Sequence, residues 1–152
     1  MLVENINQRK RDSEMNREIK FRGKSHLNNE LVFGDLEYQR KKERTFIHTY
    51  KEDGSYEKCF EVEPDTVGQF TGLNDRNGTP IYEGDIVALP SNDIAFGIIT
   101  WHDNGYFFIN TSDGVWRSFG NDFRTLGEFM NLSDDHKIKV IGNIHDNLEL
   151  MK

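Results

Sequence analysis

The stretch from Phe70 to Leu89 constrains the fold more than any other part of this chain, because turn-forming residues and short apolar runs alternate along it. Asn77-Gly78 favours a turn, since both residues accept a positive φ at low cost. Pro80 follows and has no N–H to donate to a sheet, so this turn fits a loop or a sheet edge. We predict that the chain reverses here and re-enters a strand at Ile81.

Three further dipeptides of the Asp-Gly or Asn-Gly type lie beside aromatic and β-branched segments, which is the strongest local signal for antiparallel hairpins. They are Asp53-Gly54, Asn104-Gly105 and Asp113-Gly114. A turn at Glu83-Gly84-Asp85 then precedes an apolar strand, as is common where a small SH3-like barrel brings a strand across its sheet. We therefore predict a mainly β (β-rich α+β) fold, with antiparallel hairpins forming a small SH3-like or related barrel.

One segment favours a short helix, near residues 122–131. Asn121-Asp122 is a capable N-cap for it. Its apolar residues are spaced to form a single face, although Gly127 weakens the helix. These apolar residues are Phe123, Leu126, Phe129 and Met130.

Both ends of the ordered chain carry strand-like spacing. Ile19 and Phe21 sit two residues apart, which is the period of a half-buried strand. Ile138 and Val140 have the same spacing near the C-terminus, and we expect both to face inward. Cys59 lies in a strand-like run and is expected to be a small buried residue.

Residues 1–14 are polar and unpatterned, so ordering them would bury too little apolar surface to offset the entropy lost. The ordered domain is expected to begin near Met15. The predicted units are a disordered or start-site extension at 1–14, an N-terminal β subdomain at 15–64, and a C-terminal barrel-like subdomain at 65–152 that shares its core.

The composition describes a water-facing protein, with 30% charged residues and a mean hydropathy of -0.72. The sequence lacks an apolar run of the ~18 residues that a membrane-spanning helix needs, and its start lacks the apolar region of a signal peptide. A single cysteine also excludes an internal disulfide framework. We expect a cytoplasmic protein without a membrane partner.

The net charge of -7 is unevenly distributed. Residues 1–64 hold 13 Lys+Arg and 13 Asp+Glu, which leaves 6 and 13 of the totals of 19 and 26 for residues 65–152. The segment 9–24 is locally basic, with seven Lys or Arg residues. Together with an adjacent tryptophan and arginine further along the chain it supplies the candidate contact residues, which are Arg17, Lys20, Arg22, Lys24, Trp116 and Arg117.

The search for catalytic or metal-binding motifs yields no site. A calcium loop at Asp75 is disfavoured, because Leu73 takes the first ligand position and Gly84 replaces the bidentate glutamate. His102-Asp103 and His145-Asp146 each pair an imidazole with a carboxylate, but their spacing does not require them to meet. The sequence also lacks a phosphate-binding glycine loop, a nucleophile elbow and zinc-ligand spacing. We predict a protein without catalytic, cofactor-binding or metal-binding residues.

Four separated blocks resemble one pattern, that of the YopX family of small phage and prophage proteins, found mainly in Gram-positive bacteria. The blocks are 15–22, 69–78 with 81–87, 97–101 with Tyr106, and 140–147. Two departures stand out, namely the 14 residues before the usual start and Leu148 where a proline is typical. The resemblance implies a mostly β fold and a phage or prophage origin, and it implies no residue-level activity.

Three functions remain open. The first is a noncatalytic accessory protein that docks onto a host or phage protein. The alternative is nucleic-acid binding through the basic segment 9–24. The third is a metal-dependent or small-molecule enzyme that would use His102 and His145. Because open β domains expose strand edges, a homo-oligomer is a further expectation.

Overall fold

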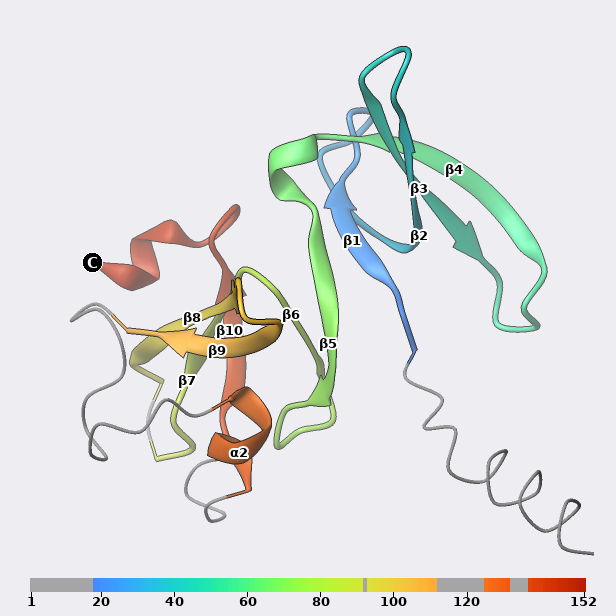
Figure 1. Cartoon of the computed structure of the whole chain (residues 1–152). Helices are drawn as coiled ribbons and strands as arrows, with labels where there is room; N and C mark the ends of the chain where they lie inside the picture. Colours follow the sequence, from blue (N-terminus) through green and yellow to red (C-terminus); the bar gives the residue numbers. More distant parts are fainter. Residues whose placement is uncertain (1–17, 92, 112–124, 132–136) are drawn as a thin grey trace, which may run out of the picture.

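The computed structural model describes residues 18–91, 93–111, 125–131 and 137–152 (Figure 1). Antiparallel strands dominate these residues. The strands are β1 (Phe21–Lys24), β2 (Leu31–Gln39), β3 (Arg44–Tyr50), β4 (Tyr56–Val62), β5 (Gly68–Asn74), β6 (Pro80–Tyr82), β7 (Asp85–Ala88), β8 (Ala95–His102), β9 (Tyr106–Asn110) and β10 (Lys139–Asn143). Helix α2 (Leu126–Met130) and the 3-10 turns η1 (Pro64–Thr66) and η3 (Leu148–Met151) complete the described elements. The predicted mainly β class is confirmed.

The first sheet has the strand order β4-β3-β2-β1-β5-β6. Strand β2 changes partner in its middle, since residues 31–34 pair with β1 and residues 35–39 pair with β3. Gly34 lies at this change, where a Cβ atom would be 1.9 Å from the carbonyl oxygen of His48. Because glycine has no Cβ, the two backbones can approach this closely and the sheet can curl.

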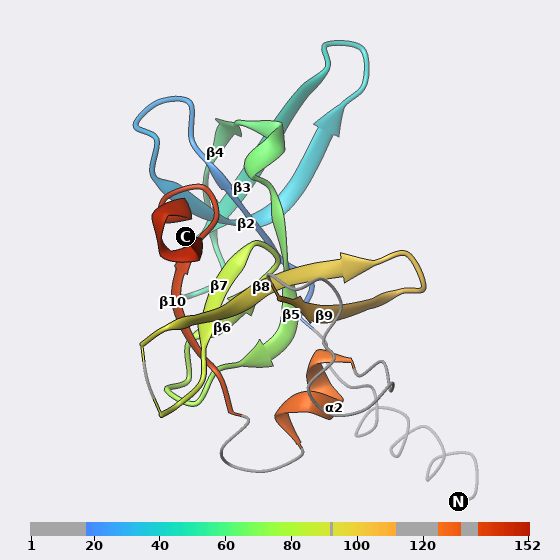
Figure 2. The same ribbon diagram turned by 90° about the vertical axis from the view of Figure 1, so that its left-hand side faces the viewer.

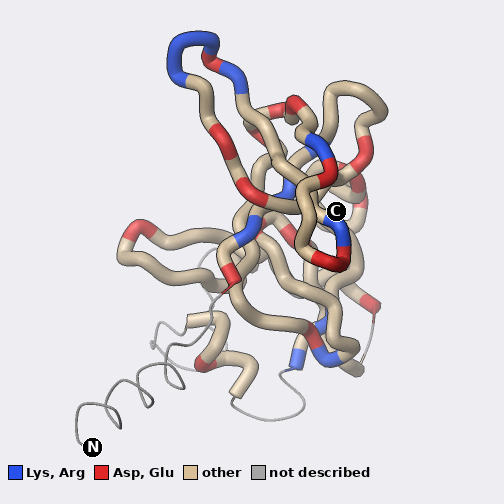
Figure 3. The backbone as a smooth tube through the Cα atoms, turned by 90° about the vertical axis from the view of Figure 1, so that its right-hand side faces the viewer, with Lys and Arg blue, Asp and Glu red and all other residues tan. Residues whose placement is uncertain are grey.

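The curl brings the end of β4 back beside β1, where Ser25 and Val62 form an isolated β-bridge. The amide of Glu63 also donates to the carbonyl oxygen of Lys24 at 2.9 Å. The described strands nevertheless form two open sheets in place of the closed barrel that the hairpin pattern suggested. The β2–β3 hairpin stands out from this sheet at the top of Figure 1 and again in Figure 3.

The second sheet has the order β10-β7-β8-β9, and helix α2 lies beside it (Figure 2). A cluster of buried apolar side chains joins this sheet to β6 and α2. Its members are Ile81, Val87, Ile99, Phe107, Ile109, Leu126, Phe129 and Ile138. Val140 is half-buried against the cluster, so the inward orientation predicted for Ile138 and Val140 is confirmed.

The turn predictions hold wherever the structure describes the residues. The hairpins at Gly54 and Gly105 connect β3 to β4 and β8 to β9, and both glycines have positive φ. Gly78 also has positive φ, in the turn that leads from β5 into the sheet-edge strand β6. The predicted turn at Asp113-Gly114 lies outside the described residues.

Helix α2 confirms the predicted helix over 126–130. Thr125 caps it, because its hydroxyl accepts the Glu128 amide while the Glu128 carboxylate accepts the Thr125 amide. The predicted cap at Asn121-Asp122 lies outside the described residues. Within the part of the chain that the structure describes, no helix has the length and apolar character that crossing a bilayer requires.

Two burial predictions were wrong. Cys59 is exposed, because β4 is the outermost strand of its sheet and most of it lacks a covering layer. Ile19 is 63% exposed, since the first strand begins only at Phe21. The division at residue 64 stays a prediction, although β5 and β6 beyond it hydrogen-bond into the first sheet.

Candidate functional site

A buried ion pair joins the two sheets. Arg22 of β1 places Nη1 2.6 Å from Oδ1 of Asp85 on β7, with side chains 7% and 1% exposed. Its Nη2 donates to the carbonyl oxygen of Glu83 at 3.2 Å, and Oδ2 of Asp85 accepts the amide of Tyr82 at 2.8 Å. Burial raises the pKa of Asp85, and the Arg22 charge opposes that rise. Arg22 therefore serves the architecture, and it offers little exposed charge to a partner.

A second ion pair links the same strand to the C-terminal turn. Nζ of Lys24 pairs with Oδ1 of Asp146, and the Lys24 side chain is 11% exposed. Oδ1 of Asn143 accepts the amides of His145 and Asp146 at 2.9 and 3.1 Å, which fixes this turn. The residues that make these two ion pairs, Arg22, Lys24, Asp85 and Asp146, are called the inter-sheet joint below.

The loop at Asp75 is built by backbone contacts. Oδ1 of Asp75 accepts the amides of Asn77 and Thr79 at 2.8 and 2.9 Å, while Oδ2 accepts the Val140 amide at 2.9 Å. The side chain is buried, and both of its oxygens are occupied by amides. This carboxylate therefore ties the β5–β6 turn to β10, in keeping with the structural interpretation of the loop.

A cavity of about 360 Å³ opens beside the joint. Its wall includes Phe33 and Tyr82, whose rings meet edge to face at 5.5 Å between centroids. Arg22 lies over the Tyr82 ring at 5.0 Å, and burial raises the pKa of Tyr82 to about 12. The charges on this wall are the Arg22–Asp85 pair and Lys20, which pairs with Glu18 at 3.1 Å. Each charge near the cavity is thus already balanced by a neighbour.

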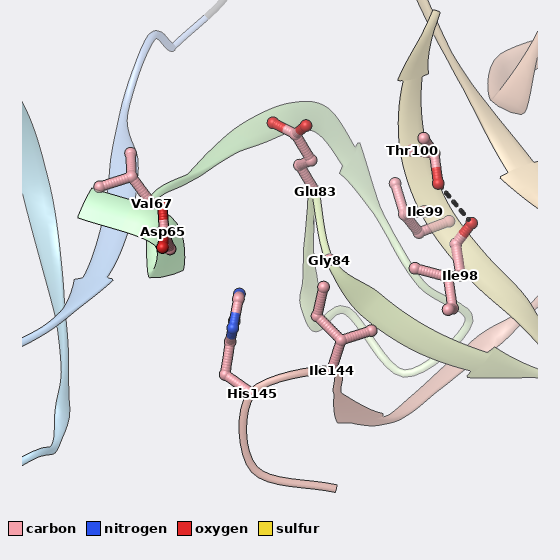
Figure 4. A pocket seen from close by; sticks show the side chains of 9 residues that line it. All are labelled: Asp65, Val67, Glu83, Gly84, Ile98, Ile99, Thr100, Ile144 and His145. Carbon is pink, nitrogen blue, oxygen red and sulfur yellow. Dashed lines mark hydrogen bonds between the residues drawn. The ribbon is translucent and has the colours of Figure 1, made fainter. Parts of the chain in front are cut away.

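A smaller pocket of about 170 Å³ lies on the second sheet (Figure 4). Asp65, Glu83 and His145 bring two carboxylates and an imidazole to its lining, and His145 projects from the C-terminal turn towards the 3-10 turn that contains Asp65. Among the residues that the structure describes, however, no three His, Cys, Asp or Glu side chains are grouped so as to hold a metal ion.

His145 should make the protein sensitive to mild acid. Burial, followed by the charges of Arg22 and Lys24, lowers its pKa below the ordinary 6.5, while Asp146 and Asp65 oppose this. The unfolded chain then binds more protons below pH 6.5, so the free energy of unfolding should fall as pH drops through this value. Denaturant titrations between pH 7 and pH 5 should show a smaller fall in the His145→Gln variant. An equal fall in both proteins would contradict the assignment.

The predicted contact residues do not assemble into one surface within the described residues. Arg22 and Lys24 are buried in the joint, and Nζ of Lys20 lies 4.8 Å from the centre of the Phe70 ring. The predicted contacts Arg17, Trp116 and Arg117 lie outside the described residues. His102 stacks on Tyr106 at the β8–β9 hairpin, with ring centroids 4.7 Å apart and nearly parallel planes.

The identity of the exposed edge strand is the feature that sequence reasoning missed. Strand β4 ends the order of the first sheet, and residues 55–59 are all exposed. Tyr50 and Tyr56 flank this edge, 46% and 55% exposed, with their rings in edge-to-face contact at 6.0 Å. We call residues 55–59 together with Tyr50 the β4 edge patch. Only the position of β4 in the sheet could have revealed it, because its sequence resembles that of a buried strand.

The fold and the joint define a class of protein with two antiparallel sheets, held together by buried ion pairs and presenting open strand edges. The chain belongs to the YopX family, since the family described as "YopX protein" matches residues 20–152. A crystal structure of protein EF1440 from Enterococcus faecalis is similar, with a TM-score of 0.53 and 21% identity over 89% of this chain and 99% of that chain. This similarity supports the fold alone. Among curated proteins, none matches the chain.

Proposed function

We propose that this chain is a noncatalytic protein-interaction module, encoded by a phage or prophage and acting in the cytoplasm of the bacterial host. The β4 edge patch is the observation that carries the proposal. A free strand edge presents a row of backbone donors and acceptors that an extended segment of another protein can pair with. Two exposed tyrosines beside such an edge supply anchoring area, because tyrosine is enriched among the residues that dominate binding energy.

We take the partner to be a different protein, because several registers disfavour the pairing of β4 with a second copy of itself. In an antiparallel pair of two identical strands, residues directly opposite each other share one face of the sheet. The two-fold axis therefore lies midway between one residue and its own copy. An axis at Glu57 or Lys58 places that charged residue opposite its own copy. An axis at Cys59 places Glu57 opposite Glu61. Like charges directly opposite each other are destabilising, so β4 disfavours pairing with itself in these registers. A register centred on Tyr56 brings no like charges together.

The engagement of candidate catalytic groups among the described residues also supports this reading. The charged groups beside the larger cavity are paired, and Asp75 is occupied by backbone amides. An enzyme needs a nucleophile or base within reach of a substrate. His102 and His145, the candidates for such a role, belong to separate features, a hairpin stack and the C-terminal pocket.

The test is affinity purification from the bacterial host with three forms of the full chain. The double variant Tyr50→Ala/Tyr56→Ala should retain a protein partner about tenfold less well than the unmodified chain, because it removes both anchors. Tyr38→Ala is the matched control. Tyr38 has the same 55% exposure as Tyr56 but lies on the opposite face of the sheet, in β2.

Hydrogen exchange then locates the contact. Adding the purified partner should slow exchange at the amides of residues 55–59, because a pairing segment would accept hydrogen bonds from this edge. A partner that binds the double variant as well as the unmodified chain would contradict the proposal. Recovery of nucleic acid without any protein would contradict it as well.

A further inference from the structure

The β2–β3 hairpin ends in a cluster of basic residues. Arg40, Lys41 and Lys42 are consecutive and exposed in the turn, and we call them the hairpin tip. The hairpin projects beyond the rest of the sheet, and Figure 3 shows its end in blue above a body that carries much of the acidic charge. The amide of Lys42 donates to the carbonyl oxygen of Gln39 at 3.1 Å, which closes the turn.

Unlike their neighbours in the hairpin, these three cations have no carboxylate partner among the residues that the structure describes. Further down the hairpin, Arg44 binds Glu61 with Nε to Oε1 at 2.7 Å, and His48 lies 2.6 Å from Glu37. Within the described residues, no ion pair engages Arg40, Lys41 or Lys42. Glu43 is the one acidic residue in the turn, where its φ of 51° is unusual for a residue other than glycine. The tip therefore projects a net positive charge from a chain whose total is -7.

We propose that the hairpin tip binds double-stranded DNA, with Arg40, Lys41 and Lys42 contacting backbone phosphates. A two-stranded β-ribbon has the width that the major groove of B-DNA admits. The acidic remainder of the chain repels a polyanion, which restricts contact to the projecting end. A lipid surface fits less well, because the tip lacks an apolar side chain to insert and has fewer basic residues than the about four to eight of a polybasic lipid-binding segment. This inference is independent of the β4 edge patch and does not depend on the proposed protein partner.

The number of contacts sets the expected affinity and its response to salt. Sequence-independent binding of this kind has dissociation constants of roughly 10⁻⁴ to 10⁻⁶ M at physiological salt. About three phosphate contacts give a slope near -2.7 for log K against log salt, so affinity should fall about 40-fold between 50 and 200 mM salt. A contact made mainly by apolar groups would respond much less to salt.

The experiment is fluorescence anisotropy of a short labelled DNA duplex of mixed sequence, titrated with the full chain. The test variant replaces Arg40, Lys41 and Lys42 by serine, and it should bind at least about tenfold more weakly at 50 mM salt. The control variant replaces three other exposed basic residues by serine, namely Lys51, Arg76 and Lys152, and so removes the same net charge. This control should bind about as well as the unmodified chain.

A gain-of-function variant separates binding from any effect on folding. Glu43→Asn removes the acidic residue next to the tip, and asparagine tolerates positive φ better than glutamate does. It should bind the duplex more tightly than the unmodified chain. Thermal unfolding of all variants shows whether the fold is retained.

Four outcomes would overturn the inference. The first is undetectable binding of the unmodified chain to DNA at 50 mM salt, and the second is equal weakening of DNA binding by both triple variants. The third is an affinity for polyglutamate equal to that for DNA. The fourth is a change in oligomeric state as the only effect of the tip variant. Equal weakening would mean that overall charge and not the tip governs binding. Equal affinity for polyglutamate would identify a general polyanion contact, and a change of oligomeric state would identify a contact between copies of this chain.

Discussion

Replacing Asp85 by alanine is expected to lower the free energy of unfolding by about 3–5 kcal/mol, because it leaves the buried Arg22 guanidinium without its charge partner. Domains of this size have a total stability of about 5–15 kcal/mol, so the variant should lose between about a fifth and all of its stability. Urea titration followed by circular dichroism measures the effect. The loss should also separate the two sheets, since this pair connects β1 to β7.

Two further variants show whether the effect comes from the buried pair. Asp93→Ala removes an acid that is 87% exposed and paired with Lys139, and it should change stability by less than about 1 kcal/mol. The double variant Arg22→Met/Asp85→Leu removes both charges and should recover much of the stability lost in Asp85→Ala, because it leaves no unpaired buried charge. If Asp85→Ala were as mild as Asp93→Ala, the ion pair would not hold the sheets together.

The second large effect is expected from Gly34→Ala. The added Cβ would lie 1.9 Å from the carbonyl oxygen of His48, which is a backbone atom and has no rotamer to move into. Strands β2 and β3 would have to separate at the point where β2 changes partner. Overpacking typically costs 1–3 kcal/mol, and a clash with backbone should reach at least the upper end of this range, about 3 kcal/mol.

Gly127→Ala is the matched control for this substitution. Its Cβ would find its nearest neighbours only at 4.0 Å, and the residue lies in helix α2, where alanine is favoured over glycine by up to about 1 kcal/mol. It should therefore stabilise the protein slightly. Equal midpoints of urea unfolding for Gly34→Ala and the unmodified chain would show that the close approach of the two strands is not required.

Hairpins could be predicted from the sequence wherever a glycine dipeptide makes the turn. Gly54, Gly78 and Gly105 all adopt positive φ, as their sequence context indicated. The turns on either side of β2 lack such dipeptides and use Asn29 and Glu43 at positive φ instead. Glycine-based reasoning therefore missed β2, and with it the basic hairpin tip.

The basic segment 9–24 shows why residues that contact a partner could not be predicted from the sequence as the hairpins were. Lys20, Arg22 and Lys24 alternate in the sequence and suggest an exposed basic face. Arg22 and Lys24 form ion pairs with Asp85 and Asp146, which lie more than sixty residues further along the chain. Local spacing contains no information about such partners. The sequence therefore suggests that Arg22 and Lys24 are exposed, whereas in the structure they belong to the inter-sheet joint.

The sequence by itself determined the mainly β class, the glycine turns, the short helix and the family, because each of these depends on local backbone preference or on short motifs. Only the tertiary structure decided which strand lies at an edge, which charges are buried as pairs and which project into solvent. These properties depend on contacts between residues distant in the chain. For that reason the β4 edge patch and the hairpin tip emerge only once the strands have taken their order in the sheet.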